Sequence, residues 1–261
     1  MKILLTGSEG FLGTSLKNYF YLNYPQYDFI CVDRKLGIEV TDVKSLSGVD
    51  FVIHLAAQPS VFNSDLTQIQ KDNIDSFKYI CDLAKISNTP FIFASSATAC
   101  ERNISSFYGE SKKINEDYAA IHYPDAIGLR FHNIYAKNPR QGTILQKLLE
   151  DNEILLVNNG QTTRHFTYIT DITEAIAFVV REYNKLAPGI YNVLNPESNT
   201  ILDLSQEVQK YRPELKIKLT KNIEGRDTIF QYVDTELPTI PINYKTIQEG
   251  IYDIFCTHIL D

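Results

Sequence analysis

The sequence has few of the residues that cross-link or anchor a chain. Its 261 residues include only four cysteines, Cys31, Cys81, Cys100 and Cys256, which are too widely spaced for a CxxC pair and have no histidine cluster beside them. We therefore expect no zinc site or disulfide framework and interpret the cysteines as buried, reduced thiols. No apolar run is long enough to span a bilayer. A chain of this length can bury a sufficient core without such supports.

Positive charge is also scarce. Lysine and arginine total 25 against 32 acidic residues, so the formal net charge is −7, and no long basic run stands out. This balance is untypical of nucleic-acid-binding proteins, but it suits a phosphorylated small ligand, which needs only a few local donors. The opening MKILLTGSEG predicts a strand and a turn and not a signal peptide, so we expect a cytoplasmic location.

The first half of the chain alternates strand-length apolar runs with helical segments. The runs mostly lack polar alternation, which is typical of parallel strands covered on both faces. Repeated strand–helix–strand units predict an α/β fold with a doubly wound parallel sheet of the Rossmann type. The predicted strands are 2–6, 28–33, 50–56, 90–96 and 125–131. The predicted helices are 10–22, 65–87 and 109–122.

The pattern loosens after residue 135. We expect a Rossmann domain over 1–135, whose core can also include parts of 165–195, and a smaller α/β region over 136–261. Asp171 and Glu174 have capping-box spacing and predict a helix start. The remaining predicted helices are 142–151, 171–184, 201–211 and 244–258, and the short strands are 153–157, 189–193 and 215–219.

A glycine-rich turn follows the first strand and opens the first helix. Gly7, Gly10 and Gly13 give the spacing GxxGxxG, and Phe11 and Leu12 precede the last glycine. Glycines let the backbone approach a pyrophosphate, and the helix N-terminus adds N–H donors and a partial positive charge. These residues predict a dinucleotide site.

The second strand ends in an acidic residue that bears on the choice of dinucleotide. Asp33 lies 20 positions after Gly13, where a carboxylate accepts hydrogen bonds from the adenosine ribose and repels a 2′-phosphate. This favours NAD over NADP as the cofactor. Arg34 is adjacent, so some tolerance of NADP stays open.

The GxxGxxG spacing after a first strand resembles the extended short-chain dehydrogenase/reductase family, and the resemblance covers nearly the whole chain. It implies an adenine-binding segment, a small-residue loop under the cofactor, and an asparagine that braces the active-site strand. The matching positions are Asp42, Val43, Leu55, Ala56, Ala57 and Asn73. His54, just before the loop, we interpret as a core histidine.

Tyr108 and Lys112 form a YxxxK motif between the fourth and fifth strands. Positions i and i+4 share a helix face, so both side chains can reach the same cofactor ribose. The ammonium and the nicotinamide ring both favour the phenolate, which makes Tyr108 the expected acid/base. The family carries a Ser or Thr at the end of the fourth strand. Ser96 is the better match for this position, and Ser95 is the alternative.

Three further residues resemble family positions that bind the diphosphate of a nucleotide sugar. Asn133 lies in LRFHNIYA, and Arg164 lies in TRHFTYITD. Arg226 matches a second diphosphate arginine or forms a surface ion pair, and both interpretations stay open.

The residues after Ser96 distinguish between two activities that the family resemblance allows, 4-epimerisation and 4,6-dehydration. FASSATA resembles the version found in sugar 4-epimerases such as UDP-glucose 4-epimerase, whereas 4,6-dehydratases carry an Asp-Glu pair where this chain has Ala97-Thr98. Two departures concern the sugar pocket: Ser96 and Tyr108 are only 12 positions apart, and Cys100 replaces an aromatic residue.

These features predict an NAD-dependent nucleotide-sugar 4-epimerase that works through a transient 4-keto sugar and needs no metal. One alternative is an NAD(P)H-dependent NDP-4-keto-sugar reductase, and another is a non-catalytic, dinucleotide-binding regulatory protein. The family resemblance also implies a homodimer formed by the helices at 65–87 and 109–122. Phe77, Ile80, Cys81 and Ala84 have helical spacing there, although they can equally face the sheet.

Overall fold

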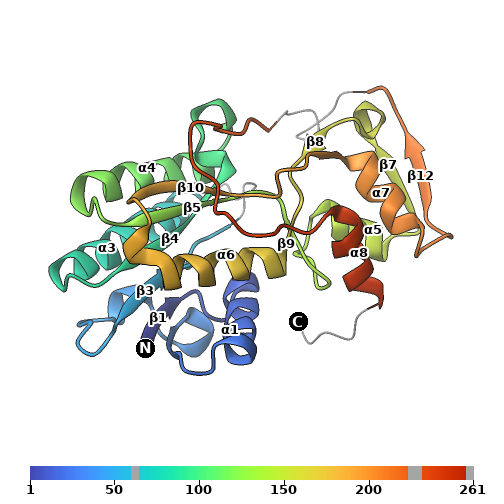
Figure 1. Ribbon diagram of the computed structural model, residues 1–261. Helices are drawn as coiled ribbons and strands as arrows, with labels where there is room; N and C mark the ends of the chain where they lie inside the picture. Colours follow the sequence, from blue (N-terminus) through green and yellow to red (C-terminus); the bar gives the residue numbers. More distant parts are fainter. Residues whose placement is uncertain (60–64, 223–230, 257–261) are drawn as a thin grey trace. The chain divides into compact units, whose positions relative to one another are not determined.

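The computed structural model describes residues 1–59, 65–222 and 231–256 (Figure 1). The chain divides into two compact units, and each is continued by distant segments. The first unit contains 1–131, 173–193 and 232–241, and the second contains 132–172, 194–231 and 242–261. The first unit thus includes part of 165–195, as the sequence allowed, and also 232–241, which was not expected.

The chain returns to the first unit because its sheet gains a last strand late in the sequence. The 232–241 segment then lies along that strand: the backbone N–H of Asn192 donates to the carbonyl of Pro238 at 2.8 Å, and the N–H of Ile240 donates to the carbonyl of Asn192 at 3.0 Å. A boundary drawn from sequence pattern alone does not register these long-range pairings.

The first unit is built on six strands that all pair in parallel. They are β1 (Lys2–Thr6), β2 (Asp28–Val32), β3 (Phe51–His54), β4 (Phe91–Ser96), β5 (Ile127–Phe131) and β10 (Gly189–Val193). Their order across the sheet is β10-β5-β4-β3-β1-β2, so the order reverses at β1. Doubly wound sheets bind ligands beyond the carboxyl ends of the strands at such a reversal.

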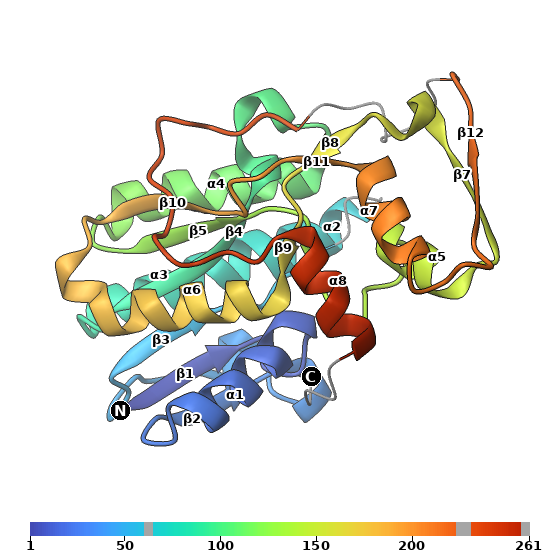
Figure 2. The same cartoon turned by 45° about the vertical axis from the view of Figure 1, so that its right-hand side comes forward.

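Helices cover both faces of this sheet, with α3 and α4 on one face and α1 and α6 on the other (Figure 2). Phe77 of α3 contacts the ring of Tyr118 of α4, and Arg181 of α6 lies over the ring of Tyr24 at the end of α1. The helices are α1 (Phe11–Asn23), α2 (Leu66–Ile69), α3 (Ser76–Ile86), α4 (Phe107–His122) and α6 (Ile169–Glu182). A π-helix over Gln70–Asp75 joins α2 to α3, within the segment predicted as one helix over 65–87.

Among its described residues, the second unit contains three two-stranded sheets and three complete α-helices. β6 (Ile134–Tyr135) pairs with β9 (Thr167–Tyr168), and β7 (Glu153–Leu156) pairs with β12 (Lys216–Leu219), both in parallel. β8 (Thr163–Arg164) pairs with β11 (Asn199–Thr200) in antiparallel fashion. The helices are α5 (Ile144–Glu150), α7 (Ile201–Gln209) and α8 (Ile247–Cys256).

The predicted capping box at Asp171 is wrong. Helix α6 begins at Ile169, so Asp171 lies inside the first turn and is buried. Its carboxylate instead accepts a hydrogen bond from the backbone N–H of Lys245 at 2.9 Å. Asp171 therefore makes a tertiary contact that spacing along the chain cannot reveal.

All four cysteines are free, as expected, but they are not all buried. Cys81 and Cys100 are buried, Cys31 is half-buried and Cys256 is exposed at the end of α8. Among the described residues, no three or more His, Cys, Asp and Glu side chains gather in a way that could hold a metal ion. In the same part of the chain, every helix is too short or too polar to cross a membrane.

Candidate active site

The glycine-rich turn packs tightly at the sheet reversal. Gly7 has φ +72°, and a Cβ atom there would come 2.7 Å from the backbone nitrogen of Ala56 in the loop after β3. A Cβ on Gly13 would lie 2.1 Å from the carbonyl oxygen of Gly7. Larger residues are excluded because the opposing atoms are backbone. Gly10 immediately precedes α1, so the turn directs the N-terminal end of that helix, the predicted pyrophosphate site, towards the end of β1.

The loop after β3 is fixed to β1 by hydrogen bonds. The N–H of Leu55 donates to the carbonyl of Thr6 at 3.1 Å, and the N–H of Ala56 donates to the Thr6 hydroxyl at 3.3 Å. These contacts hold the predicted small-residue loop, which ends with Ala57, beside Gly7. The two segments thus meet at the reversal, where a dinucleotide is expected.

His54 is a core histidine, as the sequence suggested. It is buried, its Nδ1 lies 2.8 Å from the Thr6 hydroxyl, and its ring contacts that of Phe77 edge-on. Burial, together with the nearby charge of Lys112, lowers the pKa of His54 to about 3. The imidazole is therefore neutral and belongs to the core.

Asp33 lies beside the glycine-rich turn. Its Oδ2 accepts a hydrogen bond from the backbone N–H of Glu9 at 3.0 Å, and its Oδ1 accepts one from the N–H of Lys35 at 2.9 Å. The carboxylate is thus held next to the pyrophosphate turn and half-buried. This is the position that a ribose-binding carboxylate requires.

The adenine-binding segment lies in and after a 3₁₀ helix at Val40–Asp42. The Asp42 carboxylate accepts a hydrogen bond from the N–H of Glu39 at 2.9 Å, and the carbonyl of Val43 accepts one from the hydroxyl of Tyr79 at 2.7 Å. The second bond ties the segment to α3.

Asn73 lies in the π-helix and is fully buried. Its Oδ1 accepts from the N–H of Gln58 at 2.6 Å, and its Nδ2 lies 3.1 Å from the hydroxyl oxygen of Ser111 on α4. The backbone carbonyl of Asn73 also accepts from the side-chain amide of Asn115 at 2.8 Å. Asn73 therefore links the loop after β3 to the helix that carries the YxxxK motif.

The two serines at the end of β4 have different partners. The Ser95 hydroxyl is buried and donates to Glu116 Oε1 at 2.5 Å, and Glu116 also forms a buried, two-bond ion pair with Arg130. The Ser96 Oγ instead accepts from the N–H of Thr98 at 3.2 Å and from its hydroxyl at 2.9 Å. With its oxygen accepting twice, the Ser96 hydroxyl has its own proton to donate, which makes Ser96 the stronger candidate.

Lys112 is buried one helical turn after Tyr108. Its ammonium donates to the carbonyl of Ala94 at 3.0 Å and lies 5.8 Å from the centre of the Tyr108 ring. Burial lowers the pKa of Lys112 to about 8, and the negative charge of Glu116 partly opposes this shift. Lys112 thus joins α4 to β4 and places a cation beside the tyrosine.

The short connection between Ser96 and Tyr108 keeps the two residues close to one another. A Cβ on Gly109 would lie 2.7 Å from the carbonyl oxygen of Thr98, so the start of α4 packs directly against the residues after β4. The connection is also anchored: Asn103 donates to the carbonyls of Ala97 at 2.8 Å and Tyr232 at 2.6 Å. Asn103 was not singled out from the sequence, because a buried loop asparagine carries no periodic signal, and Thr98 was identified only as the replacement of an acidic residue.

Two of the predicted diphosphate-binding residues lie in the second unit. Asn133 has φ +26°, and its side-chain amide bonds to Gln231. Arg164 lies on β8 and donates to the carbonyl of Thr163 at 2.8 Å. The N–H of Thr167 donates to the carbonyl of Asn133 at 3.2 Å, which joins the two segments. Arg226 lies outside the described residues.

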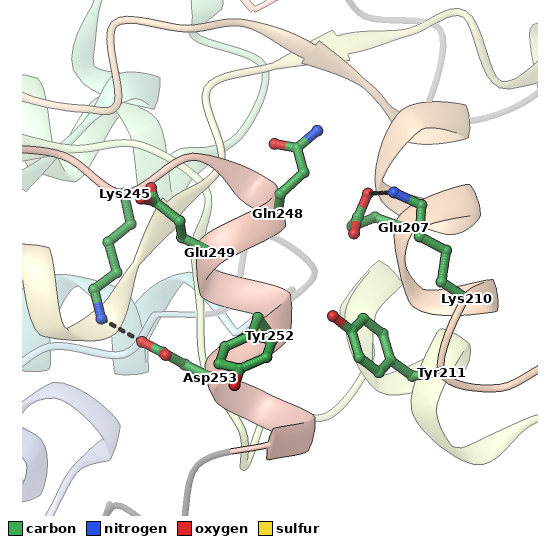
Figure 3. A pocket seen from close by; sticks show the side chains of 8 residues that line it. All are labelled: Glu207, Lys210, Tyr211, Lys245, Gln248, Glu249, Tyr252 and Asp253. Carbon is green, nitrogen blue, oxygen red and sulfur yellow. Dashed lines mark hydrogen bonds and ion pairs between the residues drawn. The ribbon is translucent and has the colours of Figure 1, made fainter.

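A surface groove of about 660 Å³ also lies in the second unit, between α7 and α8 (Figure 3). Tyr211 and Tyr252 flank it, and its lining residues differ from the predicted site residues. Its lysines are already paired, Lys210 with Glu207 at 2.5 Å and Lys245 with Asp253. The groove is therefore separate from the predicted chemistry.

A model of the NAD dependent epimerase/dehydratase family matches residues 3–193. The uncharacterized UDP-glucose epimerase YtcB of Bacillus subtilis (strain 168) is 24% identical, and the match covers 90% of this chain and 85% of that protein.

Two solved structures show the same fold. UDP-glucuronic acid 4-epimerase from Bacillus cereus, in complex with UDP-glucuronic acid and NAD, has a TM-score of 0.78 at 20% identity, covering 98% of each chain. TunA, an NAD-dependent NDP-hexosamine 5,6-dehydratase, has a TM-score of 0.76 at 23% identity, covering 96% of this chain and 95% of that one. Relatives with the same fold thus include both epimerases and dehydratases.

Proposed function

The chain belongs to the NAD dependent epimerase/dehydratase family, and we propose that it is a nucleotide-sugar 4-epimerase. One observation carries the choice of reaction. The Ser96 hydroxyl is followed by Ala97-Thr98, and Thr98 hydrogen-bonds to Ser96. The family resemblance implies an Asp-Glu pair at this point in sugar 4,6-dehydratases. Thr98 cannot ionise like a carboxylate at neutral pH, so it offers no acid/base pair for expelling a hydroxyl.

The first unit fits the family's cofactor, NAD. The glycines let the turn after β1 pack against neighbouring backbone where a side chain would clash, and Asp33 lies beside that turn, where it can accept hydrogen bonds from the adenosine ribose. When bound, NAD accepts a hydride from the sugar and later returns it. The residues proposed to hold NAD are Gly7, Gly10, Phe11, Leu12, Gly13, Asp33, Asp42, Val43, Leu55, Ala56, Ala57, Tyr108 and Lys112.

Asn73 is proposed to act indirectly. Its side chain is committed to Gln58 and Ser111, so it positions the loop after β3 and helix α4. Asn73 is therefore a positioning residue in this proposal.

Ser96, Tyr108 and Lys112 then share the proton transfer. Tyr108 takes the proton of the C4 hydroxyl and returns it when the 4-keto sugar is reduced. The Ser96 hydroxyl donates to the C4 oxygen, and Thr98 holds it in that role. The Lys112 ammonium favours the ionised form of Tyr108 by its charge.

Asn133 and Arg164 are proposed to hold the diphosphate of the nucleotide sugar. An arginine suits this group because its planar guanidinium can donate two hydrogen bonds to phosphate oxygens. Their role rests on the resemblance of their segments to the family's substrate-binding segments.

The purified protein tests the proposal in two steps. Mass spectrometry of copurifying ligands should find NAD and a nucleotide sugar, and the protein should interconvert a 4-epimer pair such as UDP-glucose and UDP-galactose, or another nucleotide-sugar pair that the ligands identify. Retention of the cofactor through turnover is expected. Stoichiometric consumption of NADPH with a 4-keto sugar would instead identify a reductase, and neither reaction with intact cofactor binding would favour a regulatory protein.

A homodimer through α3 and α4 is also proposed, by family resemblance. Phe77, Ile80, Cys81 and Ala84 do not support it, because they are buried in the core that the helices form with the sheet. The exposed side of α4 carries Ile121, which is 74% exposed. Light scattering at micromolar concentration should show twice the chain mass, and a monomer would reject this part of the proposal.

A further inference from the structure

Two basic residues follow Asp33 directly, and both bond to other groups of the first unit. Lys35 donates its ammonium to the carbonyl of Glu9 at 2.8 Å. Arg34 donates through Nε to Glu39 Oε2 at 3.2 Å and through Nη2 to Asp72. An arginine next to the ribose-binding carboxylate is what a site for a 2′-phosphate requires, so the partners of Arg34 decide what the site can bind.

Asp72 is the stronger of the two Arg34 partners. Its side chain is 2% exposed, whereas those of Arg34 and Glu39 are 49% and 45% exposed. The second Asp72 oxygen accepts from the side-chain amide of Gln68, so both oxygens are satisfied. Leaving a buried carboxylate without its cation costs several kcal/mol, whereas an exposed pair contributes little. Arg34 is therefore fixed mainly by Asp72.

The π-helix sets this carboxylate in place. Asp72, Asn73 and Ile74 are three consecutive buried residues of Gln70–Asp75. Asn73 is directed to the loop after β3, and Asp72 is directed to the segment after β2. The π-helix thus contacts two segments of the predicted cofactor site, the loop after β3 and the segment after β2. Turns of π-helix are frequent at functional sites.

We propose that Asp72 determines the choice between NAD and NADP by holding the Arg34 guanidinium away from the 2′ position of the adenosine ribose. This rests on the proposed placement of that ribose at Asp33. The three carboxylates of Asp33, Glu39 and Asp72 outweigh the two positive charges of Arg34 and Lys35. The surroundings of the 2′ position are therefore acidic and repel a phosphate. From the sequence alone, Arg34 left NADP binding possible. In the structure, Arg34 neutralises the buried Asp72 carboxylate.

Asp72→Asn tests the proposal by calorimetry with NAD and NADP on the full-length protein. The substitution removes the charge that retains Arg34, so the affinity for NADP should rise about tenfold, as expected for one new charge-assisted contact. The affinity for NAD should stay within about threefold of wild type, because the NAD ribose is bound by Asp33. Asp75→Asn is the matched control. It removes the same charge from the same π-helix at an exposed position whose carboxylate bonds to Gln70, and both affinities should stay as in wild type.

Arg34→Gln, alone and combined with Asp72→Asn, shows whether Arg34 carries the effect. The double variant should lose the gain in NADP affinity. Arg34→Gln alone should weaken the NADP binding of the wild type by less than about threefold, because the guanidinium does not contact the 2′-phosphate and only its charge is lost. A gain that persists without Arg34, an Asp72→Asn variant that binds NADP no better than wild type, or a loss of NADP affinity of about tenfold or more in Arg34→Gln would overturn the proposal. The last of these needs only the Arg34 variant, so the proposal can be overturned even if Asp72→Asn does not fold.

These outcomes are separate from the proposed sugar reaction. Dinucleotide affinities are measured without turnover, so a failed epimerase assay leaves them interpretable. A wild type that binds neither dinucleotide would overturn both this inference and the placement of the cofactor.

Discussion

The two units hold their predicted site residues in different ways. In the first unit, Gly7 and Gly13 face backbone atoms within 3 Å of a hypothetical Cβ, and Asn73 and Lys112 are buried with hydrogen bonds to other elements. In the second unit, Asn133 and Arg164 lie on or beside two-residue strands and are half-buried. In the first unit the backbone around the six-stranded sheet fixes the site residues. In the second unit their positions depend on side chains at the ends of two-stranded sheets.

This difference explains what a sequence can specify at each place. A close backbone approach restricts the residue to glycine, and a buried polar group restricts its neighbours to matching donors and acceptors. A half-buried arginine on a short strand tolerates many surroundings. We therefore expect changes in the first unit to affect cofactor binding and chemistry, and changes in the second to affect the nucleotide sugar alone.

The largest effect is expected at Tyr108. Tyr108→Phe keeps the ring and removes the hydroxyl, so the protein should fold and bind NAD while turnover falls about 10²–10⁴-fold, as for a lost general acid–base. Tyr118→Phe is the matched control on the same helix. It also removes a tyrosine hydroxyl, one that donates to the exposed carboxylate of Asp82. Steady-state assays on the identified nucleotide sugar decide the matter. Wild-type turnover in Tyr108→Phe would show that the proposed mechanism is wrong.

Most of the first unit was predictable because local and tertiary signals agree there. Its predicted strands match β1 to β5 within a few residues, since each is a short apolar run between turns. The π-helix was not predicted, because its apolar spacing over six residues does not differ from that of an α-helix. Asp72 was also missed. A single acidic residue in a helical segment is normally predicted to be exposed, and only the structure shows that Asp72 is buried and paired with Arg34.

Tertiary contacts also explain the wrong or incomplete predictions. Asp171 has the spacing of a helix cap, but its carboxylate caps the N–H of Lys245, 74 positions away. The domain division could not include Tyr232–Pro241, because this segment is joined to the first unit by long-range contacts, such as its pairing with β10 and the hydrogen bond from Asn103 to Tyr232. The roles of Asn133 and Arg164 stay predictions for a related reason: their surroundings do not demand these residue types.

Arg164 tests the second unit directly. Arg164→Ala removes a charge-assisted contact to phosphate worth about 1.5–3 kcal/mol, so the affinity for the nucleotide sugar should fall roughly 10–100-fold. NAD affinity should not change. Arg140→Ala, at an exposed arginine of the same unit, is the control. If calorimetry finds weaker NAD binding and unchanged sugar binding, then Arg164 serves the cofactor and the proposed division between the units fails.

Gly13 tests how far the backbone of the first unit is fixed. In Gly13→Ala the new Cβ would lie 2.1 Å from the Gly7 carbonyl oxygen, so the turn must open and NAD affinity should fall about tenfold. Gly142→Ala in the second unit is the counterpart. Its φ of +79° strains the backbone, but the new Cβ meets open space and NAD affinity should be kept. Equal NAD affinity in both variants would remove the distinction between a packed cradle and an ordinary turn.

The smallest effect concerns the pH dependence that His54 gives the first unit. Burial and the charge of Lys112 lower the pKa of His54 to about 3 in the folded protein, whereas in the unfolded chain its pKa is near the ordinary histidine value of about 6.5. Between these values the unfolded state binds a proton that the folded state does not, so the free energy of unfolding falls as pH falls. From pH 7 to pH 5.5 the loss attributable to His54 is about 1 kcal/mol. His54→Gln lacks this titration, so its urea-unfolding free energy should fall by about that much less than the wild type's over the same range.

His122→Gln removes an exposed imidazole on α4 and serves as the matched control. Wild type and His54→Gln losing equal stability between the two pH values would show that His54 does not carry the pH dependence. His54 would then be less completely buried than its contacts with Thr6 and Phe77 indicate.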